Sequence, residues 1–265
     1  MRISPRPLAA VIVFLVYLAF FYGVWIATSV EYNDIGDAVD TLLKWYVAPT
    51  WIGGLFLIIA VSWLGWWRPV LFEKNRAPRW VLIAPLFMLA LVIVFLFFSD
   101  YSGLAAGMIP VLILGSIGVG FSEEVVSRGV IVTGFRSRFT EPWVWFWSCF
   151  LFAILHLPNW FFGLGPSAVG QVLLAFGAGS TLYLLRRGSG TLWWAIALHA
   201  VWDFATIGGE APLGLTGLLF INAVLGFVVA VVMLRRERGR RIEQVGVPVD
   251  ESGSESATSN TSASG

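Results

Sequence analysis

Apolar residues run along this chain in long stretches that short polar segments interrupt. A helix of roughly 20 residues crosses the hydrocarbon core of a bilayer, and eight apolar stretches come near that length. They lie at residues 8–29, 45–67, 80–98, 108–135, 142–157, 168–185, 190–207 and 213–234. The pattern therefore predicts an all-α, polytopic membrane protein of about eight transmembrane helices.

The sign of the charged residues alternates between successive connecting segments. Of the 17 Lys and Arg residues, all but Lys44 and Arg128 lie toward the chain ends or in every second connection. The connections between them carry Glu31, Asp34, Asp37, Asp40, Asp100 and Glu210. Because cytoplasmic loops are enriched in Lys and Arg, both termini are predicted to lie in the cytoplasm, and the protein is predicted to be a multi-pass protein of the cell membrane.

The composition agrees with a lipid bilayer as the main partner. The chain is 58% hydrophobic and 12% charged, whereas soluble domains have about 25% charged residues. Its single cysteine, Cys149, excludes an internal disulfide. Without a basic tract interleaved with aromatic residues, no nucleic-acid partner is expected. Residues 242–265 are rich in Ser, Gly and Glu, and this composition predicts a disordered tail.

The fourth apolar stretch carries charges near its middle, at Glu123, Glu124 and Arg128. Each charge at membrane depth costs several kcal/mol, so the three require partners or a water-filled cavity. In a helix, Glu124 and Arg128 share a face, with the acid on the favourable N-terminal side. Glu123 is rotated by about 100° from its neighbour. It therefore needs a partner from another helix.

The only two histidines, His156 and His199, also fall inside predicted spans. Asp203 follows His199 by four residues and so shares its helical face. Counted by helical rise from the basic ends of their spans, these residues and Glu123 lie about 14–21 Å deep. Each residue alone fits a structural role, such as an interhelical hydrogen bond. Their arrival at similar depths from three helices favours one intramembrane site.

These residue types offer two kinds of chemistry. A carboxylate can take a proton from water while a histidine holds that water, and a second histidine can steady the oxyanion of a tetrahedral intermediate. The candidate ligands Glu123, His156 and His199 could instead bind a divalent metal such as zinc. The chain has neither the His-Glu-x-x-His spacing nor a cysteine ligand set. No cofactor is therefore assigned, and zinc stays an open alternative.

Three motifs follow one another along the chain. They are Glu123-Glu124-x-x-x-Arg128, Phe152-x-x-x-His156 and His199-x-x-x-Asp203. In this order on successive intramembrane helices, they resemble the signatures of the CPBP intramembrane proteases. That family contains the type II CAAX prenyl endopeptidases and the bacterial Abi, or bacteriocin self-immunity, proteins. The resemblance covers about residues 80–234.

The resemblance implies a role for each motif. Glu123 and His156 would activate water, with Glu124, Arg128 and Phe152 in support. His199 and Asp203 would stabilise the transition state. Many members have Asn at the last position, so Asp203 would have to be protonated, orient His199 or bind a metal. The family is filed with the metalloproteases, but these motifs do not settle metal dependence.

The same resemblance divides the chain and orients its cavity. Residues 80–234 would form the protease core, residues 1–79 would serve packing or substrate gating, and residues 235–265 would be a basic stop followed by the disordered tail. The family's cavity faces the cytoplasm, which implies substrates from that side or from within the bilayer.

The sequence therefore predicts an endopeptidase that cleaves membrane-associated or CAAX-like polypeptides. Two other classes stay open. One is a transporter or proton relay that uses the same buried groups, although the chain lacks the duplicated halves common in transporters. The other is a catalytically silent bacteriocin-immunity protein.

Overall fold

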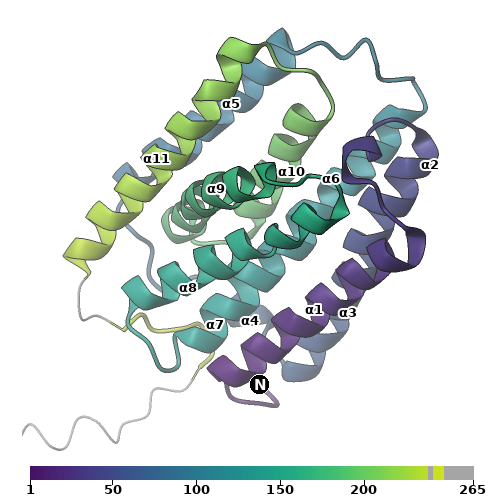
Figure 1. Ribbon diagram of the computed structural model, residues 1–265. Coiled ribbons are helices and arrows are strands. Elements are labelled where there is room, and N and C mark those ends of the chain that lie inside the picture. Colours follow the sequence, from purple (N-terminus) through teal and green to yellow (C-terminus); the bar gives the residue numbers. More distant parts are fainter. Residues whose placement is uncertain (238–240, 248–265) are drawn as a thin grey trace, which may run out of the picture.

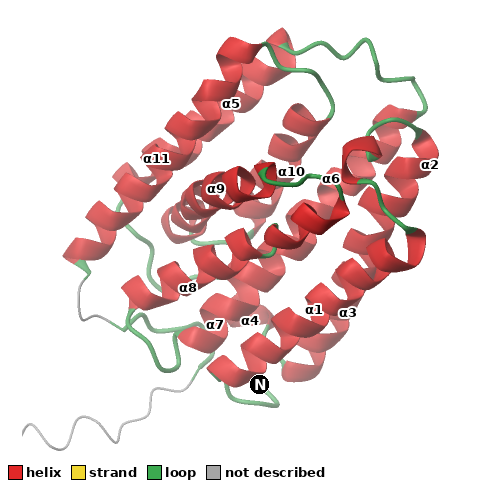
Figure 2. Ribbon diagram, in the orientation of Figure 1, coloured by secondary structure: helices red, strands yellow, loops and turns green. Residues whose placement is uncertain are grey.

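The computed structural model describes residues 1–237 and 241–247, and its regular elements there are helices joined by loops (Figures 1 and 2). The α-helices are α1 (Pro7–Thr28), α2 (Val39–Thr41), α3 (Ala48–Leu64), α4 (Trp67–Leu71), α5 (Ile83–Phe98), α6 (Met108–Glu124), α7 (Val132–Phe135), α8 (Glu141–Ile154), α9 (Ser167–Ser189), α10 (Trp193–Ile207) and α11 (Leu213–Arg236). Short 3₁₀ turns occur at η1 (Tyr32–Asp34), η3 (Arg79–Leu82) and η5 (Leu157–Phe162), and π-helical turns at η2 (Leu42–Val47) and η4 (Val125–Ile131). The predicted all-α class is confirmed.

Seven helices of the described chain are long and apolar enough to cross a membrane. They are Pro7–Thr28, Val39–Leu64, Arg79–Phe98, Met108–Phe135, Glu141–Phe162, Ser167–Ser189 and Gly214–Arg236. This confirms a multi-pass membrane protein. The predicted span at 190–207 corresponds to α10, whose 15 residues fall short of that length.

Helix α10 nevertheless joins the two ends of the helical bundle. At its start, the Leu192 amide donates to the carbonyl of Leu71 over 2.9 Å. Beyond its end, Glu210 and Asp100 exchange backbone hydrogen bonds of 2.9 and 3.0 Å. Leu71 precedes helix α5 and Asp100 follows it, so these contacts lie at opposite ends of α5. Eight segments therefore run between the two ends, as predicted, although the seventh is short.

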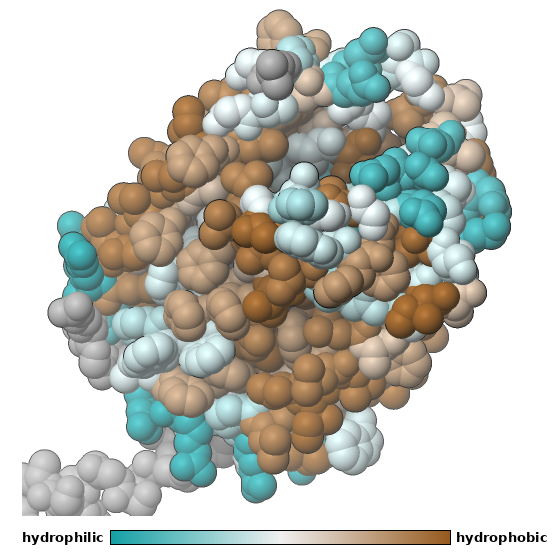
Figure 3. All heavy atoms as spheres, in the orientation of Figure 1, coloured by the Kyte–Doolittle hydropathy of each residue, from teal (hydrophilic) through white to brown (hydrophobic). Residues whose placement is uncertain are grey.

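The surface has an apolar belt between two polar ends (Figure 3). We call the end formed by loops 65–79 and 136–140 the basic face, and the end formed by loops 29–38, 99–107 and 208–212 the acidic face. The Arg2 amide donates to the Leu64 carbonyl over 3.1 Å, and Lys74 forms an ion pair with Glu243. Both described ends of the chain therefore lie at the basic face. That this face is cytoplasmic stays a prediction from charge.

The predicted disordered tail is partly described. Glu73 and Gln244 form a β-bridge, and Gln244 is buried, so residues 242–247 pack on the basic face, contrary to the predicted disorder there. These few residues pair with a loop backbone instead of needing a core of their own. The rest of the predicted tail lies outside the described residues.

Helices α6 and α10, which carry the first and third motifs, pack in close contact. A Cβ at Gly120 would lie 2.7 Å from the Ile196 carbonyl oxygen and 2.9 Å from the Ala200 amide nitrogen. Only a glycine fits at such a separation, and small residues of this kind let membrane helices approach closely. This approach brings the carboxylates of α6 beside the histidine of α10.

A group of buried ion pairs closes the bundle at the basic face, and we call it the basic-face cluster. Arg136 Nη1 donates to the two carboxylate oxygens of Glu73 over 3.0 and 2.9 Å, and Arg136 Nε donates to Glu141 over 3.0 Å. Arg187 Nη1 also donates to Glu141 over 2.7 Å, and Arg186 Nε lies 2.7 Å from Glu73. Burial raises the pKa of Glu73, but the nearby guanidinium groups, Arg136 first, outweigh burial and hold this pKa below its usual value.

Candidate active site

Glu124 links the first and third motifs. Its Oε1 accepts a hydrogen bond from Arg128 Nη1 over 2.9 Å and another from His199 Nδ1 over 2.9 Å. Glu124 and Arg128 are fully buried. The predicted Glu124–Arg128 pair is therefore present. The sequence did not predict that Glu124 also holds a histidine 75 residues away.

This bond fixes the orientation of His199. A carboxylate accepts hydrogen bonds, so Nδ1 carries the hydrogen and Nε2 points the other way. Nε2 lies 3.9 Å from Glu123 Oε2 and 3.8 Å from Asp203 Oδ1. Asp203 lies on the same face of α10, as its four-residue spacing predicted. One imidazole therefore stands among three carboxylates, one bonded at Nδ1 and two near Nε2.

Glu123 has a free acceptor atom in this arrangement. Its side chain is buried, and its Oε2 has no hydrogen-bond partner within the described residues. An unpaired carboxylate oxygen in a buried position is costly, so a native structure keeps one where a substrate or water completes it. The sequence left Glu123 without a partner on its own helix, and the structure gives its Oε2 no direct hydrogen bond.

Phe152 lies between the guanidinium group of Arg128 and the imidazole rings of His156 and His199. The guanidinium carbon of Arg128 is 3.8 Å from the centre of its ring, a distance at which a cation is attracted to the ring face. The rings of His156 and His199 contact it edge-on, with centroid distances of 5.3 and 5.7 Å. Phe152 thus separates Arg128 from the two histidines and packs against all three.

His156 lies within the span Glu141–Phe162, as predicted, at the break between α8, which ends at Ile154, and the 3₁₀ turn η5. Pro158 follows it closely, and the residues before a proline tend to leave the helical conformation. Its Nδ1 is 3.1 Å from the carbonyl oxygen of Phe152. A carbonyl only accepts, so Nδ1 carries the hydrogen and Nε2 is left as the acceptor. Within the described chain, no hydrogen bond or ion pair links His156 to Glu123.

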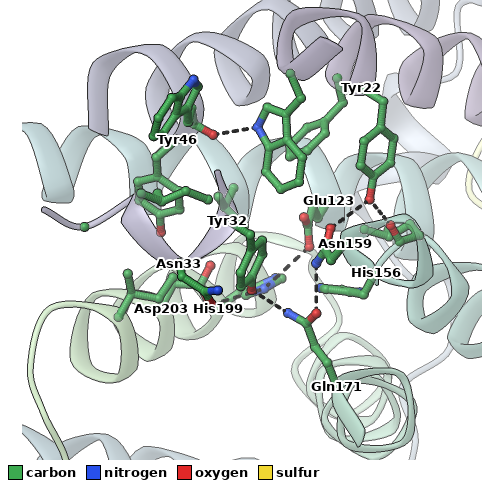
Figure 4. A pocket seen from close by; sticks show the side chains of 18 residues that line it. Tyr22, Tyr32, Asn33, Tyr46, Glu123, His156, Asn159, Gln171, His199 and Asp203 are labelled. Atoms are coloured by element: carbon green, nitrogen blue, oxygen red, sulfur yellow. Dashed lines mark hydrogen bonds and ion pairs between the residues drawn. The ribbon is translucent and has the colours of Figure 1, made fainter. Parts of the chain in front are cut away.

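Glu123, His156, His199 and Asp203 line one cavity of about 420 Å³ (Figure 4). A second cavity of about 630 Å³, bordered by apolar residues of α9 and by Asn222 of α11, shares the two histidines and Asp203. The catalytic candidates thus stand where two cavities meet. The structure brings together the residues that the three motifs selected.

A chain of polar side chains borders the first cavity and was not predicted. Asn159 Nδ2 donates to Gln171 over 2.8 Å, and Gln171 Nε2 donates to the Tyr32 hydroxyl over 2.9 Å. On the other side, the Tyr22 hydroxyl donates to Asn159 Oδ1 over 3.3 Å and to the carbonyl of Leu155. The available signal was that Asn159 and Gln171 are amides close to apolar spans, where each needs a partner.

The first cavity reaches toward the acidic face. Its border includes Tyr32, Asn33, Ile35 and Gly36 of loop 29–38, and Asn33 and Gly36 are exposed. The sequence analysis expected cytoplasmic termini and a cytoplasm-facing cavity. Because the described chain ends lie at the basic face, these two expectations cannot both be right.

The donor atoms do not form a ready metal site. No three His, Cys, Asp or Glu side chains of residues 1–237 and 241–247 are arranged to hold a metal ion. Zinc takes three or four such ligands at about 2.0–2.3 Å. The candidate ligands Glu123, His156 and His199 line one cavity without converging on one point, so we derive no step through a metal.

A family model described as type II CAAX prenyl endopeptidase Rce1-like matches residues 105–205. This match supports membership of the CPBP family, as the three motifs indicated. The matched segment is shorter than the expected 80–234, but it contains all three motifs. Comparison with the curated proteins and with the solved structures finds no match. Because the matched model describes a family of peptidases, the match supports a membrane-embedded peptidase.

Proposed function

We propose that the protein is an intramembrane endopeptidase that cleaves a peptide bond with a water molecule activated at Glu123. The observation that carries the proposal is the unpaired Oε2 of Glu123 at a cavity that His156, His199 and Asp203 also line. A buried acceptor beside space for a substrate is what a general base requires. The family's peptidase character supports the same reaction class.

In the proposed reaction, Glu123 and His156 activate the attacking water. Glu123 accepts a proton from water while Nε2 of His156, left as an acceptor by the bond from Nδ1 to Phe152, accepts the second hydrogen of that water. The water oxygen attacks the peptide carbonyl and forms a tetrahedral intermediate. The carbon–nitrogen bond then breaks, and the proton held by Glu123 passes to the leaving amine.

His199 and Asp203 serve the oxyanion in this proposal. Glu124 fixes the imidazole through Nδ1, so Nε2 points into the cavity. In the doubly protonated, cationic ring Nε2 also carries an N–H, and this N–H donates to the oxyanion. Asp203 Oδ1, 3.8 Å from Nε2, orients that nitrogen. Of the three roles left open for Asp203, this geometry supports orientation of His199.

A proton relay is less well supported than a peptidase. A relay needs linked polar groups from one face to the other. In the described chain, no side-chain hydrogen bond or ion pair joins Glu124 and Arg128 to the basic-face cluster. A substrate cavity at one end fits an enzyme better. A catalytically silent protein stays the alternative that only an activity measurement removes.

The test is a survey of new protein termini in membranes of host cells that express the wild-type protein or Glu123→Gln. Glutamine keeps the shape of the side chain and cannot act as the base, so termini made by this enzyme should be absent from the variant. Equal termini in the two samples, with both proteins folded and abundant, would contradict the proposal. Metal analysis of the same two purified proteins and of His156→Ala tests the zinc alternative, since zinc that is lost only in His156→Ala supports a ligand set.

A further inference from the structure

We propose that substrates enter the site from the acidic face, and that this face is extracytoplasmic. The enzyme would then cleave segments of secreted or membrane-anchored polypeptides on the outer side of the membrane, and not cytoplasmic ones. This inference rests on the proposed function for the cleavage step alone. The direction of access stands on the cavity and on the charge distribution.

The cavity has an entrance at one end and a closed floor at the other. The entrance lies at loop 29–38, where Gly36 is exposed and borders the cavity. Toward the basic face, every residue of η4 (Val125–Ile131) and α7 (Val132–Phe135) is buried. That segment is about 15 Å long at ordinary helical rise. A polypeptide cannot reach Glu123 through it without unpacking the bundle.

The basic-face cluster closes the same end more firmly. Glu73 and Glu141 are buried and hold the guanidinium groups of Arg136, which follows α7, and of Arg186 and Arg187 in α9. Parting these elements for a substrate would leave buried charges without partners, which costs several kcal/mol. No residue of loops 65–79 or 136–140 borders either of the two cavities.

The charges decide which face is outside. In the sequence, all but two of the 17 Lys and Arg residues lie toward the chain ends or in the connections that alternate with the acidic ones. One exception, Lys44, is paired with Asp40. A cavity open to the cytoplasm would require nearly all positive residues to lie outside, against the strong bias toward cytoplasmic Lys and Arg. The acidic entrance is therefore assigned to the extracytoplasmic side.

The second cavity indicates the shape of the bound segment. It continues from His156, His199 and Asp203 between α9 and α11, where Leu174, Ala178 and Leu219 border it. An extended polypeptide that enters beside loop 29–38 would pass Glu123 and place apolar side chains there. The preferred substrate is thus a segment with apolar residues to one side of the cleaved bond.

Cysteine labelling in intact cells tests the direction of access. The single native Cys149 is fully buried, so the wild-type protein is the unlabelled background. A Cβ at Gly36 would meet nothing within 4 Å, and Arg138 is an exposed residue of the basic face. A membrane-impermeant maleimide should label Gly36→Cys in intact cells and label Arg138→Cys only after permeabilisation. The reverse result would overturn the proposal.

The attached label then tests whether this entrance serves the site. Labelled Gly36→Cys should lose the wild-type-specific termini that the same variant shows before labelling. Gly214→Cys is the matched control, because Gly214 is exposed at the acidic end, has open space around it and borders neither cavity. Its label should leave the termini unchanged, and termini that survive the label at Gly36 would contradict entry there.

The two proposals fail separately. If the wild type and Glu123→Gln give the same termini, the peptidase is refuted while the labelling still reports the open face. If termini differ but fall in cytoplasmic segments, the peptidase stands and extracytoplasmic access is refuted.

Discussion

Two clusters of buried charge meet the fourth transmembrane segment, and they differ in how completely their carboxylate oxygens are paired. In the basic-face cluster, Glu141 accepts from Arg136 and Arg187 and also from the Tyr183 hydroxyl. In the catalytic cluster, one oxygen of Glu123 and one of Glu124 have no hydrogen-bond partner in the described chain. Only the second cluster borders the cavities described above.

The difference indicates that the basic-face cluster stabilises the fold, whereas the cluster of Glu123 and Glu124 serves the proposed reaction. A network in which every carboxylate oxygen is paired stabilises the bundle, because each carboxylate loses its partners if the helices part. A site with unpaired acceptors gives up some stability so that a substrate or water can complete it. Changes in the two clusters should therefore have opposite effects on stability and activity, and the following variants are ordered by their expected loss of stability.

The largest loss is expected from Glu141→Gln. It removes the charge that three buried donors share, and breaking a buried pair costs about 3–5 kcal/mol. The folded yield in detergent and the thermal midpoint should both fall sharply. Glu210→Gln is the control, since Glu210 is an exposed carboxylate of the acidic face. Equal stability of the two variants would show that the basic-face cluster does not hold the bundle.

Glu124→Gln should affect both stability and activity. Its Oε1 accepts from Arg128 and His199, and a hydrogen bond to a charged group is worth about 1.5–3 kcal/mol. The loss should lower the folded yield and also release the orientation of His199, so cleavage per folded molecule falls. Normal yield with normal cleavage would refute the role of Glu124 as the link between Arg128 and His199.

Gly179→Ala tests the packing behind the site. The added Cβ would lie 2.5 Å from Nη2 of Arg128 and 3.0 Å from the Phe152 ring. Overpacking of this kind costs about 1–3 kcal/mol, and displacement of Phe152 should also reduce cleavage. Gly170→Ala on the same helix meets nothing within 4 Å, so thermal unfolding of this pair measures the contact alone. Equal midpoints would show that the neighbours move aside freely.

Glu123→Gln should have the smallest effect on stability and the largest on activity. The carboxylate forms no hydrogen bond through its buried Oε2, so replacing it by a neutral amide should change stability by less than about 1 kcal/mol. Thermal midpoints in detergent should match the wild type while the termini disappear. A strongly destabilised Glu123→Gln protein would place Glu123 with the structural carboxylates and erase the contrast between the clusters.

The sequence alone determined the elements and the candidate residues. Hydropathy follows from local composition, so it located the seven long spans to within about six residues at each end, including the one that ends the bundle at Arg236. Spacing along a helix is local too, and it predicted the Glu124–Arg128 pair and the shared face of His199 and Asp203. Charge at depth and the order of the motifs selected the residues that border the cavity.

The tertiary structure decided what those residues contact. The bond from His199 to Glu124 joins residues 75 positions apart, and it exists because Gly120 lets α6 and α10 approach closely. No periodicity contains that information, since it depends on how two helices pack. The same holds for the amide chain through Asn159 and for the face to which the cavity opens, both of which arise from contacts between segments distant in sequence.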